Sequence, residues 1–267
     1  MAFKLFDYQS SGKGVSKTAP QKKPFFKYWE IFGRKFWKLI ELNMLYVLFC
    51  IPIITFGPAT AALTHVMRKF ILEQPCFVFD EFFTAFKKNF KQSVFIGIVD
   101  VIMIVSVWIA CFQFLMNESL PDGSLVFICI MICCATLVFI MHFYIYLEIV
   151  ALNLSIGSIL KNAVFLVFLG VKRNFIALII NLVIISLIVL FLPFSVFAVI
   201  FLPLSLMCFT TTFICYPVIQ KYIVNPYYEE RGERNPELGP ITEEDIAENA
   251  VFVDRGGSEK EIKATPK

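Results

Sequence analysis

The sequence has little charge and few groups suited to catalysis or metal binding. Asp, Glu, Lys and Arg make up 17% of the 267 residues, whereas a water-soluble domain usually carries about 25%. The chain has two histidines, and none of its eight cysteines forms a Cys-x-x-Cys pair, so zinc-type spacing is missing. It contains no nucleophile–base arrangement or phosphate-binding loop. These absences argue against an enzyme, a metal or cofactor site, and a nucleic acid partner.

Apolar residues are what the chain has in excess. They make up 58% of the sequence and include 31 phenylalanines. Four runs are long enough to cross a bilayer, which requires roughly 20 residues: Val94–Met116, Leu125–Leu147, Phe175–Leu192 and Phe194–Pro217. We predict an all-α integral membrane protein, with a basic, flexible N-terminus (1–24), one membrane domain (25–223) and an acidic tail (224–267). The polar, lysine-rich start lacks the apolar core expected of a signal peptide.

Charge predicts the orientation of these spans. Two short loops are expected to face outward: Asn117–Ser124, which has two acidic residues and no basic one, and the uncharged turn around Pro193. The other flanks are basic, which is typical of the cytosolic side. Residues 1–38 hold nine basic and two acidic residues, whereas residues 226–267 hold six basic and eleven acidic ones. Both termini are therefore predicted to be cytosolic.

The stretch Asn43–Leu63 begins as a membrane span and then breaks. Pro52 interrupts the apolar run, and Gly57-Pro58 ends it. Proline and glycine at membrane depth require the freed backbone groups to find partners in protein or water. The apolar part, Met44–Phe56, is about 20 Å long as a helix, which is short for a span. We therefore predict a shallow or re-entrant hairpin that turns at Gly57-Pro58 and returns to the cytosolic side.

Bulky apolar residues recur at the same helical spacing in three places. Each series places one apolar stripe on a helix, ends at a basic residue followed by Lys or Asn and then Phe, and precedes an apolar segment. We interpret this as three units, each an amphipathic helix on the cytosolic side, a basic elbow and a hairpin into the membrane. Chance recurrence in apolar-rich helices is the alternative. The series are Phe25, Trp29, Phe32, Phe36; Phe79, Phe83, Phe86, Phe90; and Val164, Phe168, Val171, Phe175.

Two blocks of sequence resemble one protein family. Asn43-Met44-Leu45-Tyr46 with residues 51–63, IPIITFGPATAAL, looks like the signature of the YesL-like family of bacterial membrane proteins. Residues 86–92, FKKNFKQ, are similar to that family's second marker, and the resemblance covers roughly residues 25–225. It implies a multi-span protein of the bacterial plasma membrane with an undetermined function. Members are often encoded beside carbohydrate-uptake ABC systems and glycan-degrading enzymes.

An acidic residue inside an apolar run is a candidate site. Asp100 lies about 14 Å into the membrane beyond Lys91, and an intramembrane carboxylate marks a functional site by default. It is a candidate to bind a cation, to relay a proton, or to pair with Arg68, Lys69 or His142. A protonated or hydrogen-bonded packing contact is the structural alternative.

Other polar groups within the membrane have expected structural roles. Asn43 is expected to hydrogen-bond the backbone freed by Pro52 or Gly57. Asn181 and the Thr210–Thr212 run are expected to bond across helices or back to their own chain. Glu148 is interpreted as an interfacial carboxylate facing Lys161.

The charged surfaces predict further contacts. Basic residues near the inner face are expected to contact lipid headgroups: Arg34, Lys35, Lys87, Lys88, Lys172 and Arg173. The polar tail is predicted to be disordered, with a short apolar run at Val251, Phe252 and Val253. That run is a candidate to dock on a cytosolic partner. A chance patch, or docking on the basic inner surface of the same chain, is the alternative.

Two functions follow from these observations. The first is a non-enzymatic accessory or structural partner of a carbohydrate or solute uptake system, in contact with ABC sugar importer subunits. The alternative is a small-solute or ion transporter or channel that uses Asp100 and the helix break at Pro52, Gly57 and Pro58. Convergence of Asp100, Asn43 and Thr60 on one cavity would favour transport, and a sealed apolar interior would oppose it.

Overall fold

The computed structural model describes residues 23–116, 124–152, 154–233, 235 and 237, and every regular element in this part of the chain is a helix. Contacts divide the chain into two units, Met1–Lys221 and Tyr222–Lys267. The predicted N-terminal extension (apart from its last residues), the loop at 117–123 and the apolar run at 251–253 lie outside the described residues. The elements are α1 (Pro24–Cys50), η1 (Ile53–Thr55), α2 (Phe56–Ile71), α3 (Val78–Met116), α4 (Ser124–Ala151), α5 (Ile156–Leu169), α6 (Val171–Leu190), α7 (Ser195–Phe201), α8 (Pro203–Ile219), η2 (Gln220–Val224) and α9 (Asn225–Glu230).

Four helical segments among the described residues are long and apolar enough to cross a membrane. They are Val78–Ala110, Leu125–Ala151, Val171–Leu190 and Pro203–Glu230. Each overlaps one of the predicted spans, so the prediction of an all-α membrane protein with four spans is confirmed. The last predicted span is not one helix. It is divided into α7 and α8 around Leu202, directly before Pro203.

The N-terminal hairpin turns earlier than predicted. Helix α1 ends at Cys50, Pro52 is extended, and η1 leads directly into α2. The Oγ1 of Thr55 donates to the carbonyl oxygens of Phe49 at 2.6 Å and Pro52 at 2.7 Å, which satisfies the end of α1. Pro58 lies in the first turn of α2, where its missing N–H costs nothing. The predicted turn at Gly57-Pro58 is therefore wrong, because Pro52 already stops the helix.

Helix α2 crosses α3 at two glycines, which gives Gly57 a packing role. A Cβ on Gly57 would lie 1.9 Å from the carbonyl oxygen of Ser93, and one on Gly97 would lie 2.6 Å from the Cα of Gly57. Membrane helices approach this closely only where their residues are small. Helix α2 also packs against α1, α4 and α8, and buried apolar side chains cover most of its surface.

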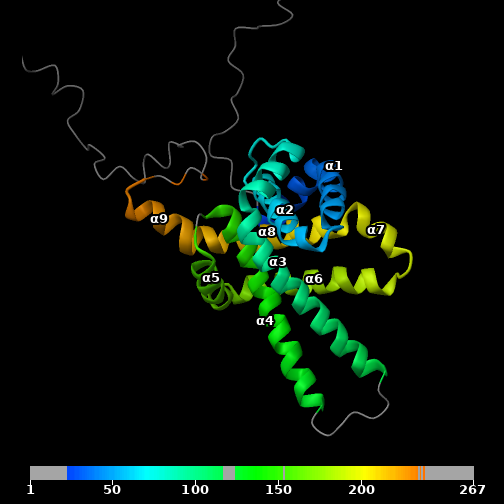
Figure 1. The fold of residues 1–267 in the computed structure, drawn as a ribbon. Helices are drawn as coiled ribbons and strands as arrows, with labels where there is room; N and C mark the ends of the chain where they lie inside the picture. The colour runs from blue at the N-terminus through cyan, green and yellow to red at the C-terminus, as the bar shows by residue number, and fades with distance from the viewer. Residues whose placement is uncertain (1–22, 117–123, 153, 234, 236, 238–267) are drawn as a thin grey trace, which may run out of the picture. The chain divides into compact units, whose positions relative to one another are not determined.

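Three helical hairpins follow one another along the chain: α1 with α2, α3 with α4, and α5–α6 with α7–α8 (Figure 1). The predicted basic elbows are not breaks in the first two. Helix α1 runs through Arg34-Lys35 and α3 runs through Lys88-Asn89, because lysine and arginine are good helix formers. In the third hairpin the chain is interrupted at Gly170, before Arg173.

The interruption at Gly170 is shaped by α4. A Cβ on Gly170 would lie 2.3 Å from the hydroxyl oxygen of Tyr144. That hydroxyl donates to Oδ1 of Asn174, and Nδ2 of Asn174 donates to the carbonyl oxygen of Val167 at 2.9 Å. Asn174 thus satisfies a carbonyl near the end of α5. Tyr144 is fully buried there, so it packs in the core and is not an exposed interface residue.

The second unit contains α9, and local side-chain contacts join this helix to the residues that follow it. The guanidinium of Arg231 lies 4.2 Å from the ring centre of Tyr227. Nδ2 of Asn235 donates to Oδ1 of Asn225 at 2.9 Å. Both contacts lie within the first residues of the acidic segment.

Candidate functional site

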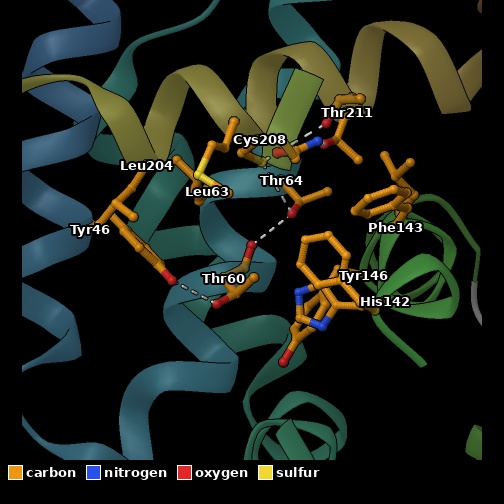
Figure 2. A pocket seen from close by; sticks show the side chains of 15 residues that line it. Tyr46, Thr60, Leu63, Thr64, His142, Phe143, Tyr146, Leu204, Cys208 and Thr211 are labelled. Carbon is orange, nitrogen blue, oxygen red and sulfur yellow. Dashed lines mark hydrogen bonds between the residues drawn. The ribbon is translucent and has the colours of Figure 1, made fainter. Parts of the chain in front are cut away.

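Helices α1, α2, α4, α6 and α8 surround a cavity of about 150 Å³ in the first unit (Figure 2). Phe139, Phe143, Leu63 and Leu204 are among its apolar lining residues. Polar groups line the same space, and they come from all five helices: Tyr46, Thr60, Thr64, His142, Asn181 and Thr211. The interior of the first unit therefore contains a cavity whose lining is partly polar, and not a core packed with apolar side chains alone.

Hydroxyl groups on α1 and α2 form one wall of the cavity. The hydroxyls of Tyr46 and Thr60 are 3.2 Å apart, and Oγ1 of Thr64 donates to the carbonyl oxygen of Thr60 at 2.8 Å (Figure 2). Oγ1 of Thr64 also lies 3.7 Å from Sγ of Cys208 on α8. Thr60 donates to the carbonyl oxygen of Phe56 at 2.8 Å. Each threonine is held by its own helix, and its oxygen keeps acceptor capacity toward the cavity.

The opposite side of the cavity joins α6 to α8. Nδ2 of Asn181 donates to Oγ1 of Thr211 at 2.9 Å and to the carbonyl oxygen of Ala177 at 2.8 Å. The expected bond across helices is therefore present. Asn181 is 1% exposed, so its amide is fixed in position by these two acceptors.

Asp100 lies behind the cavity wall and is tied to it through two residues of α4. The hydroxyl of Tyr146 donates to Oδ2 of Asp100 at 2.8 Å, and Nδ1 of His142 is 3.2 Å from the same oxygen. The rings of His142 and Tyr146 lie 4.6 Å apart between centres. Both residues line the cavity, whereas Asp100 is 7% exposed. A carboxylate beside an imidazole can hold or pass a proton.

Of the partners considered for Asp100, the structure selects His142. Nε of Arg68 donates to the hydroxyl of Tyr216 at 2.7 Å, and Nζ of Lys69 is 2.5 Å from Oε1 of Glu81. Both cations therefore have other contacts. Tyr146 is 2% exposed, so it is a buried hydrogen-bond partner of Asp100.

Asn43 does not reach the cavity, but it has a structural role of another kind. Its Nδ2 donates to the carbonyl oxygens of Val199 and Ile200, both at 2.8 Å, and its Oδ1 accepts from the backbone N–H of Ser205 at 2.7 Å. One buried side chain thus satisfies both sides of the α7–α8 break. The expected contact with backbone freed by Pro52 or Gly57 is wrong. The backbone freed near Pro203 is what Asn43 bonds.

The predicted site residues therefore divide into three groups. Thr60 and His142 line the cavity, and Asp100 adjoins it through His142 and Tyr146. Asn43 and the helix-break residues Pro52, Gly57 and Pro58 are not among its lining residues. The break that the transporter hypothesis used is therefore separate from the cavity. In the described residues no group of three or more His, Cys, Asp or Glu is arranged to hold a metal ion.

The cations predicted to contact lipid differ in their surroundings. Arg34 pairs with Glu73 at 2.5 Å, and Nζ of Lys35 lies 5.4 Å from the ring centre of Phe70. Burial is the largest cause that lowers the pKa of Lys35, and the charges of Lys38 and Arg34 lower it further. The remaining four side chains are exposed, and their contact with lipid stays a prediction: Lys87, Lys88, Lys172 and Arg173.

Comparison with known proteins gives one match. Residues 39–111 match the model of a family described as a protein of unknown function, DUF624. The YesL-like proteins are members of DUF624, so the resemblance seen in the sequence fits this match. The matched segment includes the α1–α2 turn, the Gly57–Gly97 crossing and Asp100. No curated protein and no solved structure matches the chain.

Proposed function

We propose that the membrane domain binds a small polar solute in the cavity and moves it across the membrane. The observation that carries this proposal is the convergence of hydroxyl, amide and imidazole groups from five helices on one space. Polar groups are expensive inside a bilayer, and those that occur there usually face a cavity or a partner. A purely structural bundle has no need for such a space.

The donors and acceptors around the cavity suit an uncharged, hydroxyl-bearing solute. Threonine and tyrosine hydroxyls both donate and accept hydrogen bonds, and the Asn181 amide adds a fixed polar group. Aromatic walls from Phe139, Phe143 and Tyr146 provide apolar contact. Within the part of the chain that the structure describes, no lysine, arginine, aspartate or glutamate lines the cavity. A mostly apolar lining with a few placed polar groups is typical of small-molecule sites.

Asp100 and His142 would couple the solute to protons. Because His142 both lines the cavity and lies beside Asp100, a change in its protonation alters the charge at the wall. A transporter that uses this pair would bind or move solute differently when the imidazole gains or loses a proton.

Cys208 provides a direct test of water and solute access, because its thiol is part of the cavity wall. A variant that keeps Cys208 and replaces the other cysteines with alanine is expected to react with a small charged methanethiosulfonate reagent in membrane vesicles. Glycerol, erythritol and xylitol are suitable solute probes, and a probe that occupies the cavity should slow the labelling of Cys208. The labelled fraction is measured by mass spectrometry. Uptake of the same probes is measured by light scattering of proteoliposomes that contain the protein.

The matched control is a variant that keeps only Cys215, which is also on α8 but fully buried and outside the cavity. It should remain unlabelled under the same conditions. Equal labelling of Cys208 and Cys215 would remove the evidence for an accessible cavity. If Cys208 is labelled but no probe is taken up faster, the result would agree with solute binding in the cavity and contradict solute transport.

The Asp100–His142 pair makes a second prediction. With Asp100→Asn, the labelling rate of Cys208 should depend on pH differently from that of the parent, because the carboxylate beside His142 is gone. Tyr146→Phe is the control, because it removes one hydrogen bond to Asp100 but keeps the carboxylate beside His142. The proposal of proton coupling fails if Asp100→Asn and Tyr146→Phe give the same pH profile as the parent.

A further inference from the structure

Glu148 on α4 is a carboxyl group that the cavity does not use. It is 0% exposed, and neither of its carboxyl oxygens has a hydrogen-bond partner among the described residues. Its backbone is satisfied, since its carbonyl oxygen accepts from the N–H of Leu152 at 2.8 Å. The sequence-based interpretation of an interfacial carboxylate facing Lys161 is therefore wrong. A buried acidic group without partners requires another explanation.

The protonation state of Glu148 follows from its surroundings. An ionised carboxylate taken out of water costs far more free energy than a neutral acid, unless a cation or several donors compensate it. The described residues supply no ion pair to Glu148, and the amide of the nearby Asn162 on α5 makes no hydrogen bond to either carboxyl oxygen. One amide does not compensate a full charge. The packed structure therefore requires the neutral acid.

The position of Glu148 connects it to a helix interruption. Tyr144 lies one turn earlier on the same face of α4, and its hydroxyl bonds Asn174 beside Gly170. Helix α5 packs against α4, ends before Gly170, and at 14 residues is too short to be a span. His142 and Tyr146 occupy a different face of α4, where they contact Asp100. Glu148 is thus not among the residues that line the cavity, and its neighbour Asn162 belongs to α5.

We propose that Glu148 is a proton-binding site that controls the packing of α5 on α4. It carries a proton while α5 is packed, and it releases that proton only when α5 moves away and water reaches the carboxyl. Gly170 lies between α5 and α6, so the chain is interrupted between α5 and the membrane span that follows it. The proposal does not depend on solute binding in the cavity.

Infrared difference spectroscopy tests the first part. In lipid at neutral pH, the spectrum of the parent minus that of Glu148→Gln should contain the carbonyl band of a protonated carboxylic acid. The control is Glu41→Gln, which changes an exposed residue of α1 and should remove carboxylate bands only. A carboxylate signal in place of the acid band in the Glu148 difference would overturn the proposal.

Hydrogen exchange of α5 tests the second part. If the separation of α5 from α4 releases one proton, the equilibrium constant for that opening rises about tenfold for each unit of increase in pH. This rise comes in addition to the effect of pH on the chemical rate of amide exchange. This added dependence should be present in the parent and missing in Glu148→Gln. If that variant fails to fold, exchange of α5 relative to α6 in the parent gives the same test. An α5 that exchanges with no added pH dependence contradicts the proposal. Labelling of Cys208 is a separate readout, so failure here and failure of the cavity proposal can be told apart.

Discussion

Gly57→Ala is expected to force α2 away from α3 and to destabilise the membrane domain strongly. The new Cβ would meet backbone atoms, the carbonyl oxygen of Ser93 at 1.9 Å and its carbon at 2.7 Å. Backbone cannot rotate away as a flexible side chain can, so both helices must separate. Overpacking of a core costs about 1–3 kcal/mol, and a clash with backbone belongs at the upper end of that range or beyond it. The measurement is the thermal unfolding temperature in mild detergent.

Gly33→Ala is the matched control. Gly33 lies within α1, and a Cβ there would have no heavy atom within 4 Å. Alanine favours a helix over glycine by roughly 0.5–1 kcal/mol, so this variant should be as stable as the parent or slightly more stable. If both alanine variants unfold at the same temperature, the glycine crossing does not determine how closely α2 and α3 pack.

Gly97→Ala extends the test to the other helix. A Cβ on Gly97 would lie 2.6 Å from both the Cα and the nitrogen of Gly57. Since the two glycines meet at one contact, their effects should not add. Once the first Cβ has separated the helices, the second finds part of the space already open. A double variant as destabilised as the sum of the two would indicate two independent contacts.

The long apolar runs of this sequence were sufficient to predict its spans. Hydropathy depends on residues within one segment, and each of the four segments is apolar enough by itself. The positions at which the helices end were harder to predict, because proline and glycine occur at helix ends, at helix starts and at close helix crossings. Pro52 ends α1, Pro58 begins α2, and Gly57 serves a helix crossing, yet all three lie within a few residues.

The polar contacts depend on residues far apart in the chain, which explains what sequence patterns missed. Asn43 bonds backbone at Ser205, and the cavity joins Tyr46 on α1 to Thr211 on α8. Asp100 and His142 could be proposed as a pair because both are rare polar groups inside spans. Tyr146 could not be assigned, since a tyrosine near a span end is usual at a membrane interface. The predicted partnership with ABC sugar importer subunits stays a prediction.

Asn43→Ala is expected to loosen the α7–α8 break. The substitution removes the partner of two carbonyl oxygens, on Val199 and Ile200, and of the backbone N–H of Ser205. Leaving a buried polar group unsatisfied costs about 1–3 kcal/mol, so we expect a loss of about 3 kcal/mol or more. The thermal unfolding temperature in detergent measures the total effect. Hydrogen exchange around Ser205 measures the local effect and should become faster.

Ser205→Ala separates the role of Asn43 from general damage to α8. The hydroxyl of Ser205 donates only to the carbonyl oxygen of Leu202, at 2.9 Å, while its backbone N–H keeps the bond to Asn43. A net cost of about 1 kcal/mol is expected for one such hydrogen bond, with little change in exchange at the break. The order of stability should therefore be parent, Ser205→Ala, then Asn43→Ala. Unchanged exchange in Asn43→Ala would mean that the broken helix is held by its apolar packing, and that the buried amide adds nothing to it.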